Sequence, residues 1–148
     1  MDAADIPLSD YLCLSLHVAG RAVDGMYRRL LADVDLTYPQ YVVMRMLWQR
    51  GELLVKEIGI VLDISYGTVS PLLQRLETAG LVTRTRNRDD ERAVEVALTP
   101  AGAALEEKAR HIPGAVLEGF GLTEEEGQTL RRLLDIVTSS TKASSLTS

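Results

Sequence analysis

The spacing of apolar residues changes at Gly80, and this change restricts the folds that the chain can adopt. Over residues 66–79 the apolar side chains recur at helical spacing, and Gly80 follows where a helix favours a left-handed residue. Residues 81–86 and 93–98 alternate instead with a period of two, and the polar loop 87–92 joins them. A helix that leads directly into a β-hairpin is therefore predicted here.

Helices are predicted on both sides of this hairpin. A short helix at 54–62 and a turn at 63–65 make the helix at 66–79 the second member of a helix-turn-helix. Residues 53–99 are therefore expected to form a winged helix-turn-helix. Other helices are expected at residues 9–31, 39–50, 100–112 and 123–137. We expect one domain over residues 1–148, mostly α with a small β-hairpin wing.

The sequence also predicts where several helices begin and end. Ser9 is suited to cap the first helix, which would place Cys13 at about the N4 position. Thr99 is suited to cap the fifth helix, and residues 112–114, Ile-Pro-Gly, should kink or break it. The tail from Ser139, rich in serine and threonine, is expected to fray.

Composition and length exclude several classes of protein. The chain has 148 residues, 46% of them apolar and 25% charged, as in ordinary folded proteins. No apolar run reaches the ~20 residues that a membrane span requires, and the acidic start is unlike a secretory signal. We therefore expect a cytoplasmic protein with no membrane partner. The single cysteine excludes an internal disulfide framework and a multi-cysteine zinc site, and no metal or cofactor is expected.

The distribution of charge favours DNA binding although the net charge is −5. Five arginines lie within residues 75–92, so cations cluster on one part of the chain. An apolar stripe of the helix at 66–79 should face the core; it consists of Val69, Leu72, Leu73 and Leu76. The polar residues at the N-terminal turn and outer face should enter the major groove. They are Ser65, Tyr66, Thr68, Ser70, Gln74 and Arg75.

The loop of the hairpin is expected to contact DNA in a different way. An arginine at such a tip can enter the narrow minor groove, and Arg92 is the candidate. Asp90 could hold its guanidinium through paired hydrogen bonds. Arg84, Arg86 and Arg88 are expected to contact phosphates. A solvated arginine-rich loop is the alternative, which the helix-turn-helix upstream disfavours.

Two motifs in this region resemble the MarR family of regulators. Residues 66–82 are similar to the recognition helix of that family, and Asp90-Glu-Arg with Leu98-Thr99 resembles its wing signature. The resemblance implies an obligate homodimer in which terminal helices, here residues 8–35 and 100–140, interlock. Two-fold symmetry then implies double-stranded DNA with a pseudo-palindromic operator as the partner.

Three residues outside the wing resemble the organic-hydroperoxide-sensing (OhrR) branch of this family. Cys13, Tyr27 and Tyr38 match its reactive cysteine and its two tyrosines, which in that branch come from the partner subunit. The resemblance implies a repressor whose cysteine is oxidised by an organic hydroperoxide, which releases the operator. Without a second cysteine, oxidised Cys13 should form a mixed disulfide with a small thiol or be overoxidised. His17, one turn after Cys13, could acidify the thiol or be an ordinary core histidine.

Three alternatives remain open at this point. Cys13 could be a small core residue, in a MarR-type repressor that responds to a phenolic or other small ligand. A thiol peroxidase is disfavoured, because the sequence offers no resolving cysteine and no recognisable catalytic constellation. An architectural DNA-coating protein is disfavoured by the acidic total charge. The chain is therefore not expected to be an enzyme.

The role of the wing can be tested through Arg92. Arg92→Ala should weaken operator binding and reduce the slope of log K against log salt by about one, because one cation that displaces counterions from the DNA is lost. The measurement is a titration of operator DNA at several salt concentrations. An unchanged slope would remove the tip of the hairpin from the DNA contacts.

Overall fold

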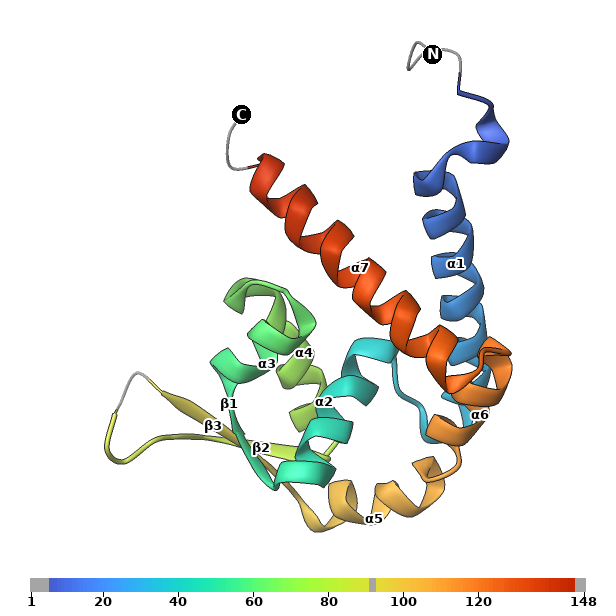
Figure 1. The fold of residues 1–148 in the computed structure, drawn as a ribbon. Coiled ribbons are helices and arrows are strands. Elements are labelled where there is room, and N and C mark those ends of the chain that lie inside the picture. Colours follow the sequence, from blue (N-terminus) through green and yellow to red (C-terminus); the bar gives the residue numbers. More distant parts are fainter. Residues whose placement is uncertain (1–5, 91–92, 146–148) are drawn as a thin grey trace. The chain divides into compact units, whose positions relative to one another are not determined.

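The computed structural model describes residues 6–90 and 93–145, and it is helical apart from one small sheet (Figure 1). The helices are α1 (Leu12–Leu30), α2 (Tyr38–Arg50), α3 (Val55–Leu62), α4 (Tyr66–Thr78), α5 (Pro100–Ala109), α6 (Ile112–Phe120) and α7 (Glu124–Ser145). The strands are β1 (Glu52–Leu54), β2 (Val82–Arg86) and β3 (Val94–Leu98), and 3-10 turns occupy Leu8–Asp10 and Ala32–Val34. Two compact units, divided between Ile112 and Pro113, make up the chain. None of the helices in the described ranges has the length and apolar character of a membrane span.

The sheet has three antiparallel strands in the order β1-β3-β2, one more than the predicted hairpin. The additional strand, β1, pairs Leu53 with Val96 of β3, and both side chains are buried. On the other side of β3, Arg84 of β2 pairs with Val96. Because β1 is only three residues long, it is too short to show an alternating pattern in the sequence. The prediction of a two-stranded wing is corrected accordingly: the hairpin is anchored to the helical core by a third strand.

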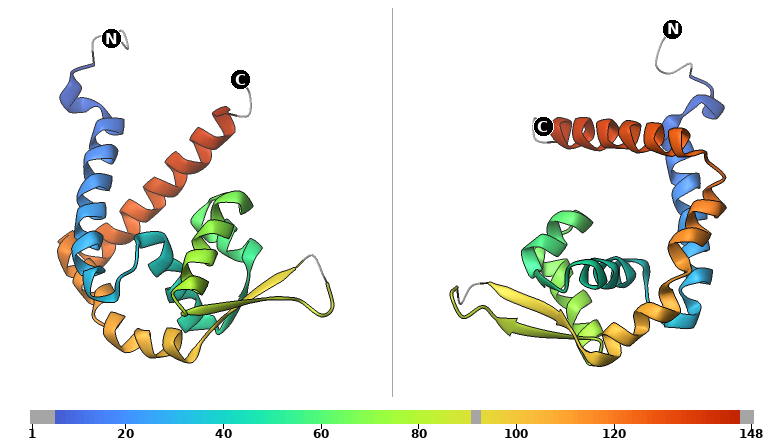
Figure 2. Two further views of the ribbon diagram at one scale, coloured as in Figure 1. Left: turned by 180° about the vertical axis from the view of Figure 1, so that it is seen from behind. Right: turned by 60° about the horizontal axis from the view of Figure 1, so that its bottom comes forward.

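The core of the first unit lies where α2, α3, α4 and the sheet meet. Met44 and Leu47 of α2, Ile58 of α3 and Leu73 of α4 are all fully buried. The predicted inward stripe of α4 is confirmed, since Val69, Leu72, Leu73 and Leu76 are each no more than 8% exposed. Figure 2 shows the β2–β3 ribbon extending beyond these helices, so that its far end does not contribute to the core. The core thus fixes α4 and the base of the ribbon in one body.

Several predicted helix boundaries agree with the structure. Thr37 caps α2 in a capping box with Gln40, in which each side chain bonds the other residue's backbone N–H. Thr99 caps α5 by accepting a hydrogen bond from the Gly102 N–H at 3.0 Å. Gly80 ends the α4 segment with φ +76°, a value that side-chain-bearing residues rarely adopt. These caps define the ends of the helices that carry the wing.

Three predictions about the helical ends need correction. Ser9 does not cap α1: it lies in the preceding 3-10 turn, and Tyr11 occupies the N-cap, which places Cys13 at N2. The fifth helix breaks at residues 110–111, and Pro113 lies in the first turn of α6, where a missing N–H costs nothing. The tail does not fray at Ser139, because α7 continues to Ser145.

Two helices leave many of their apolar side chains exposed in the part of the chain that the structure describes. Neither α1 nor α7 has a buried residue. Leu12 at 78% and Val18 at 50% are among the most exposed apolar side chains of α1. On α7 the exposed apolar residues are Leu130, Leu133, Leu134, Ile136 and Val137. Long apolar helices without a covering surface are unusual in a chain that acts alone.

One glycine is required by packing where α5 meets the start of the wing. A Cβ added at Gly102 would lie 2.0 Å from the carbonyl oxygen of Leu81 and 3.2 Å from Leu98 Cδ2. Leu81 precedes β2 and Leu98 ends β3, so Gly102 contacts the base of both wing strands. Any side chain at this position would separate α5 from the wing.

Gly102→Ala should therefore destabilise the protein by about 2–3 kcal/mol, since a backbone carbonyl must move to admit the methyl group. Gly114→Ala is the matched control, because a Cβ there meets nothing within 4 Å and α6 would gain helix propensity. The measurement is the free energy of unfolding in urea at one protein concentration. Equal stability of the two variants would contradict the close approach at Gly102.

Candidate nucleic-acid interface and sensing site

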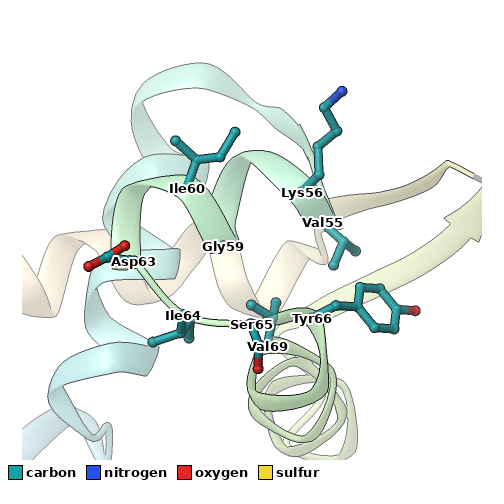
Figure 3. A pocket seen from close by; sticks show the side chains of 9 residues that line it. All are labelled: Val55, Lys56, Gly59, Ile60, Asp63, Ile64, Ser65, Tyr66 and Val69. Atoms are coloured by element: carbon teal, nitrogen blue, oxygen red, sulfur yellow. The ribbon is translucent and has the colours of Figure 1, made fainter. Parts of the chain in front are cut away.

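A close approach between α3 and the following turn sets the angle of α4. Asp63 adopts a left-handed conformation with φ 56°, and the Ile64 N–H donates to the Gly59 carbonyl at 3.0 Å. A Cβ on Gly59 would lie 3.1 Å from the Ile64 carbonyl oxygen, so a small residue is favoured there. A hollow of about 500 Å³ is lined by residues of α3, the turn and α4. In Figure 3 its lining residues Lys56 and Ile60 project from α3 on the side away from α4.

The exposed side of α4 is divided into two halves. Tyr66, Ser70 and Glu77 line a groove of about 340 Å³ together with Arg84 and Arg86 of β2. At 100° per residue, Gly67, Pro71, Gln74 and Thr78 form the centre of the outer face, opposite the buried stripe. Thr68 and Arg75 lie on the flank away from the groove. The predicted DNA-contacting residues of α4 therefore lie on different faces of the helix. Tyr66 and Ser70 lie in the groove beside the wing, whereas Thr68, Gln74 and Arg75 lie outside this groove.

Residues that the sequence argument did not select also belong to this surface. Gly67 and Thr78 share the central outer face with Gln74, and both are exposed. Glu77 is exposed as well and lines the groove beside the wing. A helical projection of α4 places it beside Tyr66 and Ser70, so the angular position of Glu77 was available from the sequence.

Hydroxyl groups cluster at the N-terminus of α4. Ser65 occupies the N-cap, but its side chain makes no bond to the backbone of the helix. Its Oγ instead lies 3.2 Å from Oγ1 of Thr68, and both residues are exposed. The N-terminal turn of a helix combines outward N–H groups with partial positive charge, which suits contact with a phosphate.

An ion pair joins α4 to the wing strand β2. Glu77 accepts a hydrogen bond from the backbone N–H of Arg84 and another from its guanidinium, each at 3.1 Å. These bonds hold the pKa of the Glu77 carboxyl below its usual value, chiefly through the guanidinium. Arg84 is thus engaged inside the chain, whereas Arg86 and Arg88 are exposed. The three arginines predicted to contact phosphates are not equivalent in this structure.

The loop of the wing is closed by hydrogen bonds across its base. The Asn87 N–H donates to the Ala93 carbonyl at 2.7 Å, and the Asn87 amide donates to Glu95 Oε1 at 2.6 Å. Asp90 accepts from the Ala93 N–H through its carbonyl at 2.9 Å. Arg92 lies outside the described residues, so its minor-groove role and its pairing with Asp90 stay predictions.

The structure brings Tyr27 and Tyr38 together and leaves Cys13 apart from them. The two rings lie 4.6 Å apart between centroids, where α1 and α2 meet. Cys13 is exposed near the start of α1, and His17 is exposed one turn further on. Tyr27 lies fourteen positions after Cys13 on the same helix, a distance of about 21 Å along its axis. Neither tyrosine can therefore reach the Cys13 thiol of its own chain.

The environment of Tyr27 keeps its phenol protonated. Partial burial raises the pKa of Tyr27, and the neighbouring Tyr38 and Tyr41 raise it further against an opposing effect of Arg45. A groove of about 460 Å³ runs past both Tyr27 and Tyr38 and is also lined by Asp24, Arg28 and Gln40. The tyrosine pair therefore presents O–H donors beside an open groove.

Over residues 6–90 and 93–145, no three His, Cys, Asp or Glu side chains gather as a metal site would require.

A helix-turn-helix with a projecting wing and arginines on both elements defines a winged-helix, DNA-binding transcription regulator. The family model described as MarR family matches residues 36–94, which contain α2, α3, α4 and most of the wing. Similarity to relatives extends well beyond this stretch. The chain belongs to the MarR family, whose members here are regulators of transcription and not enzymes.

Three relatives illustrate the extent of this similarity. The organic hydroperoxide resistance transcriptional regulator of Bacillus subtilis (strain 168) is 41% identical over 126 residues, which are 85% of this chain and 84% of the relative. The HTH-type transcriptional regulator TtmR of Methylorubrum extorquens (strain PA1) is 44% identical over 123 residues, 83% of this chain and 63% of the relative. Among solved structures, reduced AbfR of Staphylococcus epidermidis bound to DNA matches with a TM-score of 0.75 and 29% identity, covering 90% of this chain and 93% of that one.

The ion pair with Glu77 predicts different effects for two neighbouring arginines. Arg86→Ala should reduce the slope of log K against log salt for duplex DNA by about one, since an exposed cation is lost. Arg84→Ala should change the slope less, because its charge is already balanced by Glu77. The measurement is fluorescence anisotropy at several salt concentrations.

Arg110→Ala serves as the matched control for these two variants. Arg110 is 72% exposed and pairs with Glu107, and it follows α5 outside the helix-turn-helix and wing. Its removal should leave the slope unchanged. A full reduction by Arg84→Ala would mean that Arg84 leaves Glu77 and contacts phosphate in the complex.

Proposed function

We propose that this protein is a homodimeric transcription repressor that is released from its operator when an organic hydroperoxide oxidises Cys13. The observation that carries the proposal is the position of Cys13, exposed at N2 of α1 among exposed apolar side chains of the same helix, such as Leu12 and Leu16. This position lies in the first turn of α1, where the helix carries partial positive charge. The 41% identity to a regulator named for organic hydroperoxide resistance supports the same chemistry.

The separation of Cys13 from the tyrosine pair supports a dimer. A thiolate is stabilised by hydrogen-bond donors, but Tyr27 of the same chain lies about 21 Å further along α1, with Tyr38 of α2 packed against it. A second copy running in the opposite direction along α1 would bring its own tyrosine pair to this cysteine. Such pairing would also cover apolar side chains of α1 that are exposed in the single chain: Leu12, Leu14, Leu16 and Val18.

The proposed oxidation of Cys13 takes place in two steps, formation of a sulfenic acid and then of a mixed disulfide. The Cys13 thiolate attacks one oxygen of the hydroperoxide, the O–O bond breaks, and the alkoxide leaves and takes up a proton as the alcohol. Cys13 is then a sulfenic acid, and a low-molecular-weight thiol condenses with it to a mixed disulfide and water. The cysteine is oxidised by two electrons and the peroxide is reduced by two. His17, one turn along α1, faces the same side of the helix as Cys13 and is placed to supply positive charge when protonated.

Oxidation has to alter the spacing of the two recognition helices. In a two-fold dimer the α4 helices enter successive major grooves of a pseudo-palindromic operator, about 34–36 Å apart. Loss of the thiolate removes the acceptor of the tyrosine hydrogen bonds, and the added group requires space between the subunits. A small rotation of each winged helix then prevents simultaneous contact with both half-sites. As a regulator of transcription, the protein acts in the cytoplasm, where the chromosome lies.

A small ligand is the second candidate effector, and the groove at Tyr27 and Tyr38 favours it. This groove combines two phenols with Arg28 and Gln40 and measures about 460 Å³. A phenolic ligand of modest size would fit such a site. On this alternative Cys13 has only a structural role.

The two candidates differ in the behaviour of Cys13→Ser. For the wild type, the apparent operator affinity in excess organic hydroperoxide should fall at least about tenfold, within the usual range of allosteric coupling. Cys13→Ser should stay bound, because serine cannot be oxidised. The measurement is operator anisotropy, with intact mass to detect oxidised Cys13. Release of both proteins by peroxide would contradict the proposal, and release of both by a phenolic ligand alone would favour the alternative.

A further inference from the structure

A continuous series of contacts runs from the tyrosine pair to the base of the wing. Tyr27 contacts Tyr38 and also Tyr41, whose ring centroid lies 6.0 Å away. Tyr41 is 5% exposed and meets Trp48 edge-to-face at 6.4 Å, two turns along α2. The series thus leads from the candidate sensing site to the far end of α2.

Trp48 continues this series with a hydrogen bond over a long sequence separation. Its indole N–H donates to the Gly102 carbonyl at 2.9 Å, in the first turn of α5. Because an indole N–H in a partly buried site needs an acceptor, this bond fixes the ring relative to α5. α2 and α5 are therefore joined by a directional contact and not only by apolar packing.

The first turn of α5 is in turn fixed to both strands of the wing. The Thr99 hydroxyl donates to the Gly80 carbonyl at 2.6 Å, and the Thr99 N–H donates to the Leu81 carbonyl at 3.1 Å. Gly102 packs against the same Leu81 carbonyl with no room for a Cβ. A displacement of Gly102 must therefore move the end of α4, the start of β2 and the end of β3 together.

From this geometry we propose that Trp48 is a positioning residue that couples the tyrosine pair to the wing through its bond to Gly102. The coupling rests on the proposed function, because it is the state of Cys13 in the dimer that would displace the tyrosines. Trp48 contacts Tyr41 and Gly102, and it belongs neither to the tyrosine pair nor to α4 or the wing. Its contribution is to convert a shift of Tyr27 and Tyr41 into a movement of the wing base.

The decisive variant is Trp48→Phe, which keeps an aromatic ring against Tyr41 and removes the N–H donor. Operator Kd is measured for the reduced and the organic hydroperoxide-treated protein, on a duplex selected from a random library by reduced wild type. The ratio of the two Kd values should fall at least about threefold in the variant, within the range of residues that modulate coupling. Cys13 should form sulfenic acid at the wild-type rate, as measured by dimedone labelling.

His111→Phe is the matched control. Its ring nitrogen lies 3.1 Å from the Lys108 carbonyl just beyond the opposite end of α5, so the substitution also removes a ring-to-backbone contact. The control should keep the wild-type ratio. If Trp48→Phe lowers the melting temperature and both affinities but leaves the ratio unchanged, Trp48 has only a structural role and the proposal is wrong.

A second measurement separates this proposal from the peroxide hypothesis. Trp48 is the only tryptophan in the chain, so its fluorescence reports on the site directly. Operator binding to the reduced protein should shift its emission, and Tyr27→Leu should shift it without DNA. Emission unchanged in both cases overturns the coupling even if peroxide releases the wild type. Emission that shifts while peroxide leaves the wild type bound supports the coupling and contradicts the proposed effector.

Discussion

The packing of Gly102 against the Leu81 carbonyl is the constraint on which the arrangement of the reading elements depends. Leu81 follows the left-handed Gly80 that ends α4 and precedes the first strand of the wing, so its position sets the angle between the two. The absence of a side chain at Gly102 lets α5 reach this carbonyl, and the Thr99 cap holds it there. A winged helix needs its wing and recognition helix in one fixed relation, since both must contact the same duplex.

A second contact controls how charge is presented on this surface. Glu77 pairs with Arg84 of the wing, and this ion pair neutralises one cation of the positive surface and joins β2 to α4. The chain is acidic overall, so its affinity for DNA depends on a small number of placed cations and not on a general positive field. Because Arg84 is paired with Glu77, it offers less uncompensated positive charge than the exposed Arg86.

Much of the fold could be predicted from the sequence because the signals were local. The change of apolar period at Gly80, the Thr99-Pro100 start of α5 and the buried stripe of α4 all follow from short-range patterns that the structure confirms. β1 could not be predicted, because three residues carry no period and their pairing with β3 is a tertiary contact. The prediction that Ser9 caps the first helix was wrong for a different reason. Ser9 lies in a 3-10 turn, and residue types that cap α-helices are also common in such turns. The Glu77–Arg84 pair and the Trp48 bond join residues 7 and 54 positions apart, and no local pattern indicates them.

The unbroken length of α1 has a stoichiometric consequence. On the proposed function, each sensing site takes its cysteine from one chain and its phenols from the other, so a dimer holds two composite sites and an isolated chain holds none. A mixed dimer of one intact chain and one chain lacking the thiol would retain a single complete site. Sensitivity to the effector would then be inseparable from the association of the two chains. The straight helix that separates Cys13 from Tyr27 would make subunit association part of the signal.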